Sequence, residues 1–400
     1  MQVCKHFGVC GGCSSQNIDY KTQLKTKQDK VDALLAPYFS GEIKITPSPN
    51  IQYFRNKVEL GFSRQVVWKI PPGQKKVIRD KTQPLEFEEA LGFRVKGRWD
   101  RCIDLQECIL FNDKLSLLVG AVRAWAAANK IAFYDQRKHS GILRNLLVRE
   151  GKNTGQGMIV LIVAAPLACE DGFKKAVQSV YPNYSALIAL NSGLSDGSGL
   201  TDIKVLSGNA AIQEALNIEG RQIFFELSPQ AFFQTNTLAA NLMYGRVRAL
   251  IGKIRPAVLY DLYGGAGSFS LTCADLVGKS LCVESVEAAV ENGRKNAKLN
   301  KIENVEFFFD KTEDFLTKNE INANNSVIIL DPPRSGLHPK ATDATRQSGV
   351  KNIFYISCNP ITLAENLKVL TKNYNVVDVE CFDFFPHTDH IETLASLELK

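Results

Sequence analysis

The feature that most constrains the fold is a regular alternation of short apolar segments and helical segments from about residue 230 to the C-terminus. Short segments rich in Val, Ile, Leu and Phe predict buried strands, and the longer segments between most of them predict helices. The expected strands are Val258–Leu262, Ser280–Glu284, Val305–Phe309, Ser326–Leu330 and Asn352–Ile356, and the expected helices include Leu238–Ile251, Val286–Leu299, Pro339–Ser348 and Thr362–Thr371. This order predicts a parallel sheet covered by helices on both faces.

Two further segments close the chain and are expected to end the sheet. Val376–Phe382 and Thr393–Leu399 are close in sequence, as an antiparallel hairpin at the sheet edge requires. The texture before residue 230 is different, with a helix expected over residues 18–39 and then short β segments mixed with helices. We therefore expect an N-terminal loop and helix at 1–40, a central α+β domain at 41–228 and a Rossmann-like α/β domain at 229–400.

The overall composition excludes several classes of protein. With 400 residues, of which 45% are hydrophobic, the chain can bury a large core in two or three domains. We find no apolar run near the ~18 residues of a membrane span and no signal peptide, so we expect a cytoplasmic protein with no membrane partner. Because the cytoplasm is reducing, the ten cysteines argue for metal or catalytic roles rather than disulfides.

The charge is unevenly distributed along the chain. Residues 1–150 carry a net charge of +10, whereas the remaining residues carry −4. A basic front half joined to a weakly acidic back half suggests a polyanion-binding module before a catalytic one. Solvated surface charge explains such an asymmetry equally well.

A glycine-rich turn, Tyr263–Gly267, follows the strand Val258–Leu262 and marks a cofactor site. Ligands of open α/β sheets bind beyond the carboxyl ends of the strands, where glycines let the backbone approach them closely. Glu284 ends the next strand and can bind ribose hydroxyls. The third glycine of a dinucleotide fingerprint, expected near Ser270, is missing, so the pattern favours S-adenosylmethionine.

Asp331-Pro332-Pro333-Arg334 follows a later strand and indicates the substrate end of the sheet. Enzymes that methylate amino groups usually carry an aromatic residue after the two prolines, where it stacks on the target base. Arg334 occupies that place here, which argues against an exocyclic amine as the methyl acceptor.

Cys358 is the candidate nucleophile. It follows an apolar strand and precedes Asn359-Pro360, a turn into a helix, and thiols near helix N-termini have lowered pKa values. Methylation of uracil carbon 5 needs such a thiol, because adding it to carbon 6 makes carbon 5 nucleophilic, and it needs a base to remove the carbon-5 proton. Most cysteines are small buried hydrophobes. That is the better account of four others, namely Cys169, Cys273, Cys282 and Cys381.

Glu392 is the candidate base, at the point where a loop enters the last strand. Its apolar neighbours are expected to raise its pKa. Asp389 is a competing base. His387 and His390 lie in the same segment, but two histidines without further ligands more often orient other groups than bind zinc.

The N-terminal cysteines are candidate metal ligands. Cys4, Cys10 and Cys13 supply three thiols within a glycine-containing loop, and a fourth must come from elsewhere, with Cys108 preferred and Cys102 the alternative. Thiolate-only ligation suits zinc or an iron–sulfur cluster, and the spacing leaves both open.

These motifs together resemble the RNA (uracil-5-)-methyltransferases, specifically the iron–sulfur branch that acts on 23S ribosomal RNA. The resemblance covers nearly the whole chain. It rests on the cysteine loop, Phe54-Arg55-Asn56-Lys57, Pro229-Gln230-Ala231-Phe232-Phe233-Gln234-Thr235-Asn236, the glycine-rich turn, Asp331-Pro-Pro-Arg, Ser357-Cys358-Asn359 and His390-Ile391-Glu392-Thr393.

The resemblance implies a role for each candidate residue. Cys358 would be the nucleophile and Glu392 the proton acceptor. The residues that would contact the methyl donor or the target base are Gln234, Tyr263, Gly265, Ser268, Glu284 and Asp331. Cys4, Cys10, Cys13 and Cys108 would hold a [4Fe-4S] cluster. The transfer-RNA branch lacks this cysteine set, so its presence favours ribosomal RNA.

The resemblance also sets expectations for RNA binding. Many relatives begin with a small RNA-binding β-barrel, which we expect to be absent because the cysteine loop starts at residue 4. Residues 14–225 would then bind a single-stranded loop of RNA, and the enzyme is expected to act as a monomer. The basic residues expected to contact phosphates are Arg55, Lys57, Arg64, Lys75, Lys76 and Arg98.

Overall fold

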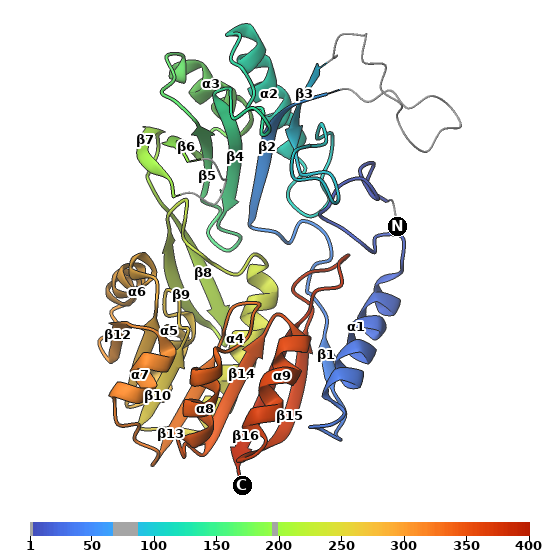
Figure 1. Cartoon of the computed structure of the whole chain (residues 1–400). Helices are drawn as coiled ribbons and strands as arrows, with labels where there is room; N and C mark the ends of the chain where they lie inside the picture. The colour runs from blue at the N-terminus through green and yellow to red at the C-terminus, as the bar shows by residue number, and fades with distance from the viewer. Residues whose placement is uncertain (1–2, 67–86, 194–198) are drawn as a thin grey trace. The chain divides into compact units, whose positions relative to one another are not determined.

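The computed structural model describes residues 3–66, 87–193 and 199–400, and the chain forms two compact units that interleave along the sequence (Figure 1). The first unit comprises Met1–Gln16, Arg55–Glu150 and Gly155–Ile212. The second comprises Asn17–Phe54, Gly151–Thr154 and Gln213–Lys400. These bounds differ from those expected at residues 40 and 228.

The first expected boundary is displaced because the N-terminal helix packs in the second unit. Helix α1 (Tyr20–Leu35) buries Val31 and Leu35 in the core of that unit, together with Ile43 from the following segment. Local periodicity predicts a helix here but does not show which core the helix joins. For this reason the helix was expected to belong with the cysteine loop.

The second unit is built on a twisted sheet, which has eight strands among the described residues. They are β1 (Lys44–Thr46), β10 (Val258–Leu262), β11 (Lys279–Glu284), β12 (Val305–Phe309), β13 (Ser326–Leu330), β14 (Asn352–Ser357), β15 (Tyr374–Phe382) and β16 (Glu392–Leu399). Their order across the sheet is β1-β15-β16-β14-β13-β10-β11-β12. β16 is antiparallel to both of its neighbours, and the other strand pairs are parallel.

The predicted antiparallel hairpin of β15 and β16 forms, but it does not lie at the edge of the sheet. β1 pairs in parallel with β15, with Lys44 opposite Glu380, and takes the edge position. A three-residue strand that pairs with residues more than 300 positions away leaves no local signal in the sequence.

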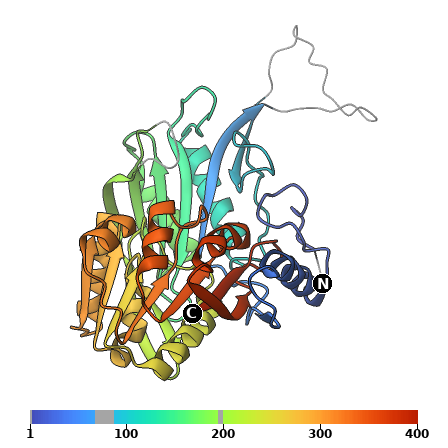
Figure 2. The same cartoon turned by 60° about the horizontal axis from the view of Figure 1, so that its bottom comes forward.

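Helices cover both faces of this sheet, as the alternation predicted. One face carries α1, α9 (Pro360–Leu370), α8 (Pro339–Gln347) and α7 (Thr312–Lys318), which lie side by side in that order (Figures 1 and 2). The other face carries α4 (Thr237–Ile254), α5 (Ser268–Cys273), the 3₁₀ turn η1 (Ala274–Leu276) and α6 (Glu287–Leu299). With both faces covered, β10 and β13 are buried along their whole length, which explains why their sequences are mainly apolar.

The first unit has a mixed sheet with the order β3-β2-β4-β5-β6-β7 among the described residues. Its strands are β2 (Lys57–Val66), β3 (Phe87–Gly92), β4 (Leu143–Glu150), β5 (Gly157–Val163), β6 (Ser185–Leu190) and β7 (Thr201–Ser207), and its helices are α2 (Leu115–Ala128) and α3 (Glu170–Val180). The two helices pack together and share a core with β2, β4 and β5. The strand expected at Val66–Ile70 lies outside the described residues beyond Val66.

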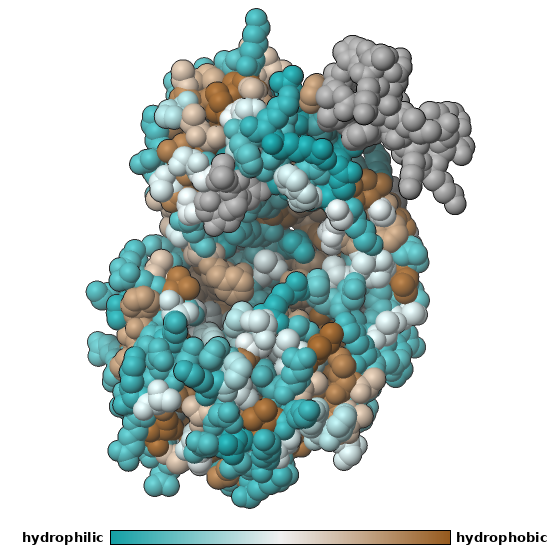
Figure 3. Space-filling view, viewed as in Figure 1, coloured by the Kyte–Doolittle hydropathy of each residue, from teal (hydrophilic) through white to brown (hydrophobic). Residues whose placement is uncertain are grey.

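A two-stranded hairpin, β8 (Ile212–Ile218) and β9 (Arg221–Leu227), leads into α4. Among the described residues, no helix combines the length and the apolar run needed to cross a bilayer. On the face drawn in Figure 3, hydrophilic residues predominate and hydrophobic ones form small separate groups. The larger apolar side chains lie mainly in the two cores.

Candidate active site

The candidate catalytic residues gather at one edge of the large sheet. Because β10, β11, β13 and β14 are parallel, their carboxyl ends meet at this edge. The order of strands reverses between β10 and β13, which is the point where open α/β sheets bind their ligands. The sequence motifs at Tyr263, Glu284, Asp331 and Cys358 each follow or end one of these strands.

A cleft of about 400 Å³ lies beside the glycine-rich turn and is lined by Tyr263, Glu284, Lys311 and His338, among others. Glu284 forms part of its wall in a fixed orientation. The Glu284 carboxylate accepts hydrogen bonds from the backbone N–H groups of Gly265, at 3.1 Å, and Val286, at 2.8 Å. The cleft therefore offers an oriented carboxylate that can bind the hydroxyls of a nucleoside.

The turn itself needs glycine at two positions. A Cβ atom on Gly264 would lie 2.3 Å from the Cys282 Sγ atom, so a larger residue would not fit. Gly267 has a φ of +80° and caps α5, in a region of backbone space that other residues rarely adopt. These contacts keep the backbone of the turn close to the cleft.

Two carboxyls, of which Asp261 is buried and Asp331 is half-buried, lie behind the turn. Asp261 is fully buried and accepts hydrogen bonds from the backbone N–H and the hydroxyl of Ser270, at 2.9 and 2.7 Å. Burial raises the pKa of Asp261 to about 6, although the bonds from Ser270 lower it. Burial, with a smaller effect of the Asp261 charge, raises the pKa of Asp331 to about 7. Asp331 can therefore exchange a proton near neutral pH.

The other two residues expected near the methyl donor or base lie on neighbouring elements. Ser268 begins α5 and hydrogen bonds with the hydroxyl of Tyr244, which is buried in α4. Gln234 lies three residues before α4 and is 9% exposed. The structure thus brings Tyr263, Gly265 and Ser268 into one turn.

Cys358 and Glu392 are brought together by the pairing of β14 with β16. Ser357, the last residue of β14, lies opposite Thr393. Cys358 follows Ser357 and Glu392 precedes Thr393, so the two side chains leave the sheet at the same edge. The Cys358 thiol is partly exposed, whereas Glu392 is only 3% exposed.

The environment of this pair alters the pKa of both groups. The pKa of the Cys358 thiol is raised, not lowered as its place before a helix predicted, because burial and the charge of Glu392 outweigh the nearby Arg334 guanidinium, which lowers it. Burial also raises the pKa of Glu392 well above its ordinary value, with a contribution from Asp331. A carboxylate with a raised pKa is a stronger base, and such shifts mark functional sites.

The turn after Cys358 fixes the position of Arg334. Asn359 caps α9 by accepting the N–H of Ile361, at 3.2 Å. Its side-chain amide donates to the backbone oxygen of Arg334, at 3.0 Å, and the Thr362 hydroxyl donates to the same oxygen, at 3.3 Å. The guanidinium of Arg334 lies 2.8 Å from Nδ1 of His390. Arg334 is therefore positioned from both sides of the catalytic pair.

The geometry does not favour Asp389 as the base, or His387 and His390 as a pair of zinc ligands. Asp389, the competing base, is exposed, whereas Glu392 is buried beside the thiol. His387 contacts Gln23 of α1, and His390 contacts Arg334, so the two histidines have different partners.

The four candidate cluster ligands line one cavity of the first unit. Cys4, Cys10, Cys13 and Cys108 surround it together with Arg55. N–H groups point at all four sulfur atoms. They come from His6 to Cys4, from Gly12 to Cys10, from Gln16 to Cys13, and from Leu110 and Phe111 to Cys108. Arg55 lowers the pKa of three of the thiols, although burial raises it in each case. Thiols with N–H donors and a nearby cation fit thiolate ligation of a cluster.

Cys102, the alternative fourth ligand, faces elsewhere. It is 1% exposed and packs against β2, so that a Cβ atom on Gly61 would lie 2.8 Å from its sulfur. Within the described ranges, no three His, Cys, Asp or Glu side chains are arranged around a single metal ion. In a cluster each thiolate binds a different iron atom, so the thiols need not converge on one point.

The basic residues expected to bind RNA have diverse environments. Arg64 is exposed and lies over the ring of Phe87, 5.0 Å from its centroid. Arg98 pairs with Asp100 at 3.0 Å, and burial lowers the pKa of Lys57. Lys75 and Lys76 lie outside the described residues.

The sequence missed some of the contacts around the thiol and the cleft. Arg334 was noted only as a replacement for an aromatic residue, and its effect on the thiol depends on packing between β13 and β14 that periodicity does not predict. Lys311 was not among the residues expected to bind the cofactor, but it lines the cleft beside Glu284.

Several known proteins are similar to this chain over nearly its whole length. Residues 200–400 match the family model described as tRNA (Uracil-5-)-methyltransferase. An uncharacterized RNA methyltransferase of Bacteroides thetaiotaomicron is 32% identical, over 99% of this chain and 87% of its own. A tRNA (uracil(54)-C(5))-methyltransferase of Pyrococcus horikoshii is 31% identical, over 98% of this chain and 85% of its own.

A solved structure extends the similarity to the whole fold. The tRNA (uracil-54, C5)-methyltransferase of Pyrococcus abyssi, in complex with S-adenosyl-L-homocysteine, has a TM-score of 0.77. It is 25% identical, and the match covers 99% of this chain and 88% of that one. The shared fold is therefore that of a methyltransferase dependent on S-adenosylmethionine.

Proposed function

Because this chain belongs to the RNA uracil-5-methyltransferase family, we propose that it methylates carbon 5 of uridine in RNA through a covalent adduct at Cys358. The observation that carries the proposal is the placement of the Cys358 thiol beside the buried Glu392 carboxyl, at the cofactor-binding edge of the sheet. This pairing supplies the nucleophile and the base that the reaction needs.

The reaction would proceed in three balanced steps. The Cys358 thiolate adds to carbon 6 of the uracil, and the electron pair of the ring moves to form an enolate. Carbon 5 then takes the methyl group from the sulfonium of S-adenosylmethionine, which leaves as S-adenosylhomocysteine. Glu392 accepts the carbon-5 proton. The electron pair of the broken carbon–hydrogen bond forms the double bond between carbons 5 and 6 and expels the thiolate, which gives 5-methyluridine. A base with a raised pKa suits the last step.

The remaining site residues would bind and orient the reactants. Glu284 would hold the ribose hydroxyls of the methyl donor, while Tyr263, Gly265 and Ser268 line the turn that approaches it. Gln234 and Asp331 would contact the target base. Arg334 would stabilise the thiolate, because its positive charge already lowers the pKa of Cys358.

Transfer RNA is the substrate that the named relatives favour. Two proteins 31% identical to this chain, from Pyrococcus horikoshii and Pyrococcus furiosus, are named tRNA (uracil(54)-C(5))-methyltransferases. The Pyrococcus abyssi protein of similar structure is also a tRNA (uracil-54, C5)-methyltransferase. We therefore take a loop uridine of transfer RNA as the first candidate, flipped out of its stack to reach the thiol.

A uridine of 23S ribosomal RNA, which the sequence resemblance favours, is the second candidate. The observation that favours it is the set of four cysteines around one cavity, because the resemblance assigned that set to the ribosomal branch. The two candidates share the same chemistry, so substrate choice leaves the roles of Cys358 and Glu392 unchanged.

The cysteine cavity is proposed to hold a [4Fe-4S] cluster through Cys4, Cys10, Cys13 and Cys108. When bound, such a cluster cross-links its loops and can carry an electron. The methylation steps transfer no electron, so a structural role is the simpler one. A cluster bound by these four residues would link residues 4–13 to the segment that contains Cys108.

The substrate is tested with anaerobically purified protein and methyl-labelled S-adenosylmethionine. Unmodified transfer RNA and unmodified 23S ribosomal RNA are incubated separately, digested, and their nucleosides identified by mass. Labelled 5-methyluridine in the transfer RNA alone supports the first candidate, and label in the ribosomal RNA alone supports the second. Label in another nucleoside would contradict the proposed chemistry.

A further inference from the structure

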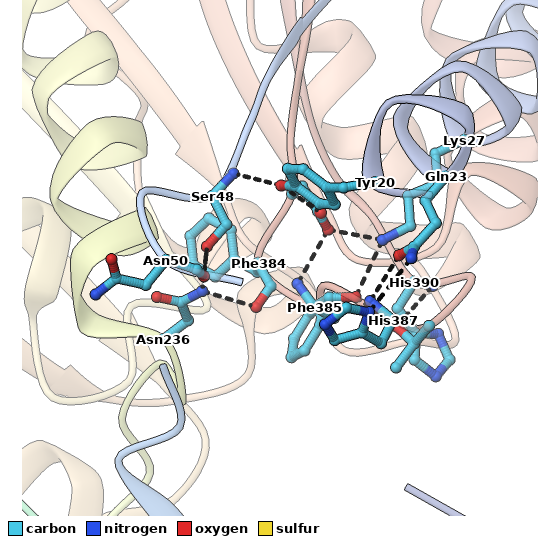
Figure 4. Close-up of polar contacts among 12 residues, drawn as sticks. Tyr20, Gln23, Lys27, Ser48, Asn50, Asn236, Phe384, Phe385, His387 and His390 are labelled. Carbon is cyan, nitrogen blue, oxygen red and sulfur yellow. Dashed lines mark hydrogen bonds and ion pairs between the residues drawn. The ribbon is translucent and has the colours of Figure 1, made fainter. Parts of the chain in front are cut away.

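A buried ion pair joins helix α1 to the loop between β15 and β16. Lys27 Nζ lies 2.6 Å from Asp383 Oδ1, and the two side chains are 4% and 0% exposed. Lys27 also donates to the backbone oxygen of Phe385, at 3.0 Å, and the Tyr20 hydroxyl donates to Asp383 Oδ2, at 2.9 Å (Figure 4). A buried pair is costly to desolvate unless further hydrogen bonds satisfy both ions, as they do here.

A second contact holds the same loop further along. The Gln23 side-chain oxygen accepts the backbone N–H of His387, at 2.9 Å, and its nitrogen lies 3.3 Å from Nδ1 of the ring. His387 has a φ of +67°, which is uncommon for a residue with a side chain. The contact with Gln23 therefore helps to retain a backbone conformation that would otherwise be unfavourable.

The buried face of α1 combines two polar residues with two apolar ones. Its buried residues are Gln23, Lys27, Val31 and Leu35, which are four apart and share one face of the helix. The last two are apolar and enter the core of the second unit. The first two are polar at positions where a helix that only packs would carry apolar residues. The polar half of this stripe faces the loop.

The loop is also held from the opposite side. Asn236, which caps α4, donates from its amide to the backbone oxygen of Phe384 and to the Ser48 hydroxyl, both at 3.0 Å (Figure 4). The backbone N–H of Ser48 donates to the Tyr20 hydroxyl, at 2.8 Å. Asn236 lies two residues after Gln234, so one network connects α1, the loop and the segment that contains Gln234.

This loop leads directly into Glu392, the first residue of β16. It leaves β15 at Phe382 and enters β16 at Glu392, and its His390 contacts Arg334. We propose that Lys27 is a positioning residue, which acts through Asp383 and the loop to keep the Glu392 carboxylate directed at carbon 5 of the bound uracil. This inference rests on the proposed function and deepens it by assigning α1 to the step that removes the proton.

The chemistry allows that step to be separated from the earlier ones. With 5-fluorouridine in the RNA, thiol addition and methyl transfer proceed, but carbon 5 carries fluorine in place of a proton. Fluorine cannot leave as a cation, so the methylated adduct persists. Its rate of formation reports the steps before Glu392 acts, whereas turnover on ordinary uridine includes proton removal.

The test compares Lys27→Met with Lys25→Met, a change on an exposed side of the same helix, where Lys25 pairs with Asp29 on the surface. For Lys27→Met we expect turnover on uridine RNA to fall by about tenfold to a hundredfold, the usual cost of a small misplacement of a catalytic group. The KM for S-adenosylmethionine and the rate of adduct formation on 5-fluorouridine RNA should match those of Lys25→Met. A covalent enzyme–RNA complex should also accumulate on ordinary uridine.

A second variant guards against misfolding, since Lys27→Met alone leaves Asp383 buried without its cation. The double change Lys27→Met with Asp383→Asn removes both charges and should show the same split between the two rates. The inference is overturned if either folded variant matches Lys25→Met in turnover, or if adduct formation falls as much as turnover. If the unmodified enzyme methylates neither transfer RNA nor ribosomal RNA, the proposed function itself has failed, which the same assay distinguishes.

Discussion

Cys358 lies beside Glu392 because Ser357, at the end of β14, pairs with Thr393 near the start of β16. One antiparallel strand, β16, in an otherwise parallel sheet thus joins a thiol and a carboxyl that are far apart in sequence. A shift of β16 by one residue against β14 would turn the Glu392 side chain to the opposite face of the sheet. The site therefore depends on the insertion of β16 between β14 and β15.

Replacing Cys358 with alanine should abolish methylation. We expect a loss on the order of 10⁴-fold or more, as for other covalent nucleophiles, because the adduct at carbon 6 can no longer form through Cys358. Cys169→Ala is the matched control, since Cys169 is a partly buried cysteine before α3 and should leave methylation unchanged. Incorporation of labelled methyl groups into RNA measures both, and substantial activity in Cys358→Ala would contradict the assigned nucleophile.

Glu392→Gln should block the reaction after methyl transfer. Turnover should fall, and the methylated covalent complex should accumulate on ordinary uridine RNA, where it can be seen as a band of reduced mobility in a denaturing gel. Asp389→Asn is the control, because Asp389 is exposed and should not be needed. Accumulation in Asp389→Asn instead would transfer the role of base to that residue.

The pH dependence of Cys358 alkylation should change when Arg334 is replaced. Its positive charge lowers the pKa of Cys358, so Arg334→Met should raise that pKa. Because only the thiolate reacts, alkylation of Cys358 by iodoacetamide, followed by peptide mass spectrometry, should then rise at a higher pH than in the unmodified enzyme. Arg334→Lys should retain most of the effect, and an unchanged profile in Arg334→Met would exclude this role.

Glu284→Gln should weaken binding of the methyl donor. The change removes a charged acceptor that is already fixed by the N–H groups of Gly265 and Val286. Hydrogen bonds to charged groups contribute about 1.5–3 kcal/mol, so the Kd for S-adenosylmethionine should rise by roughly tenfold to a hundredfold. Calorimetry can measure this Kd, with Glu287→Gln as the control. Glu287 is exposed in the first turn of α6, so that variant should bind S-adenosylmethionine normally.

The cluster proposal makes a separate prediction about composition. In anaerobically purified protein, Cys108→Ser should lose most of its iron and acid-labile sulfide, whereas Cys102→Ser should retain both. Cys108 lines the cavity with the three N-terminal cysteines, and Cys102 packs against β2. Equal loss in both variants, or none in Cys108→Ser, would contradict the assigned ligand set.

The sequence predicted the α/β unit well because its signals are local. Val258–Leu262, Val305–Phe309 and Ser326–Leu330 are strands with the expected bounds, since each is a mainly apolar segment between polar turns. The motifs at Cys358 and Glu392 could be found because each stands at the end of a predicted strand.

The parts that the sequence did not predict depend on contacts between distant residues. β7 is exposed or half-buried along its length, so it shows no apolar alternation. β1 is defined by its pairing with β15, and the role of α1 depends on the contact of Lys27 with Asp383. A lysine on a helix is normally a solvated charge, and only the tertiary structure shows that this one is buried.

The most direct test of the central claim is to trap and map the covalent adduct. The enzyme is incubated with S-adenosylmethionine and RNA containing 5-fluorouridine, then digested with protease and nuclease, and the cross-linked peptide is sequenced by mass spectrometry. The account predicts a methylated 5-fluorouridine attached to Cys358. An adduct at another residue, or methylated RNA formed without any adduct, would contradict it.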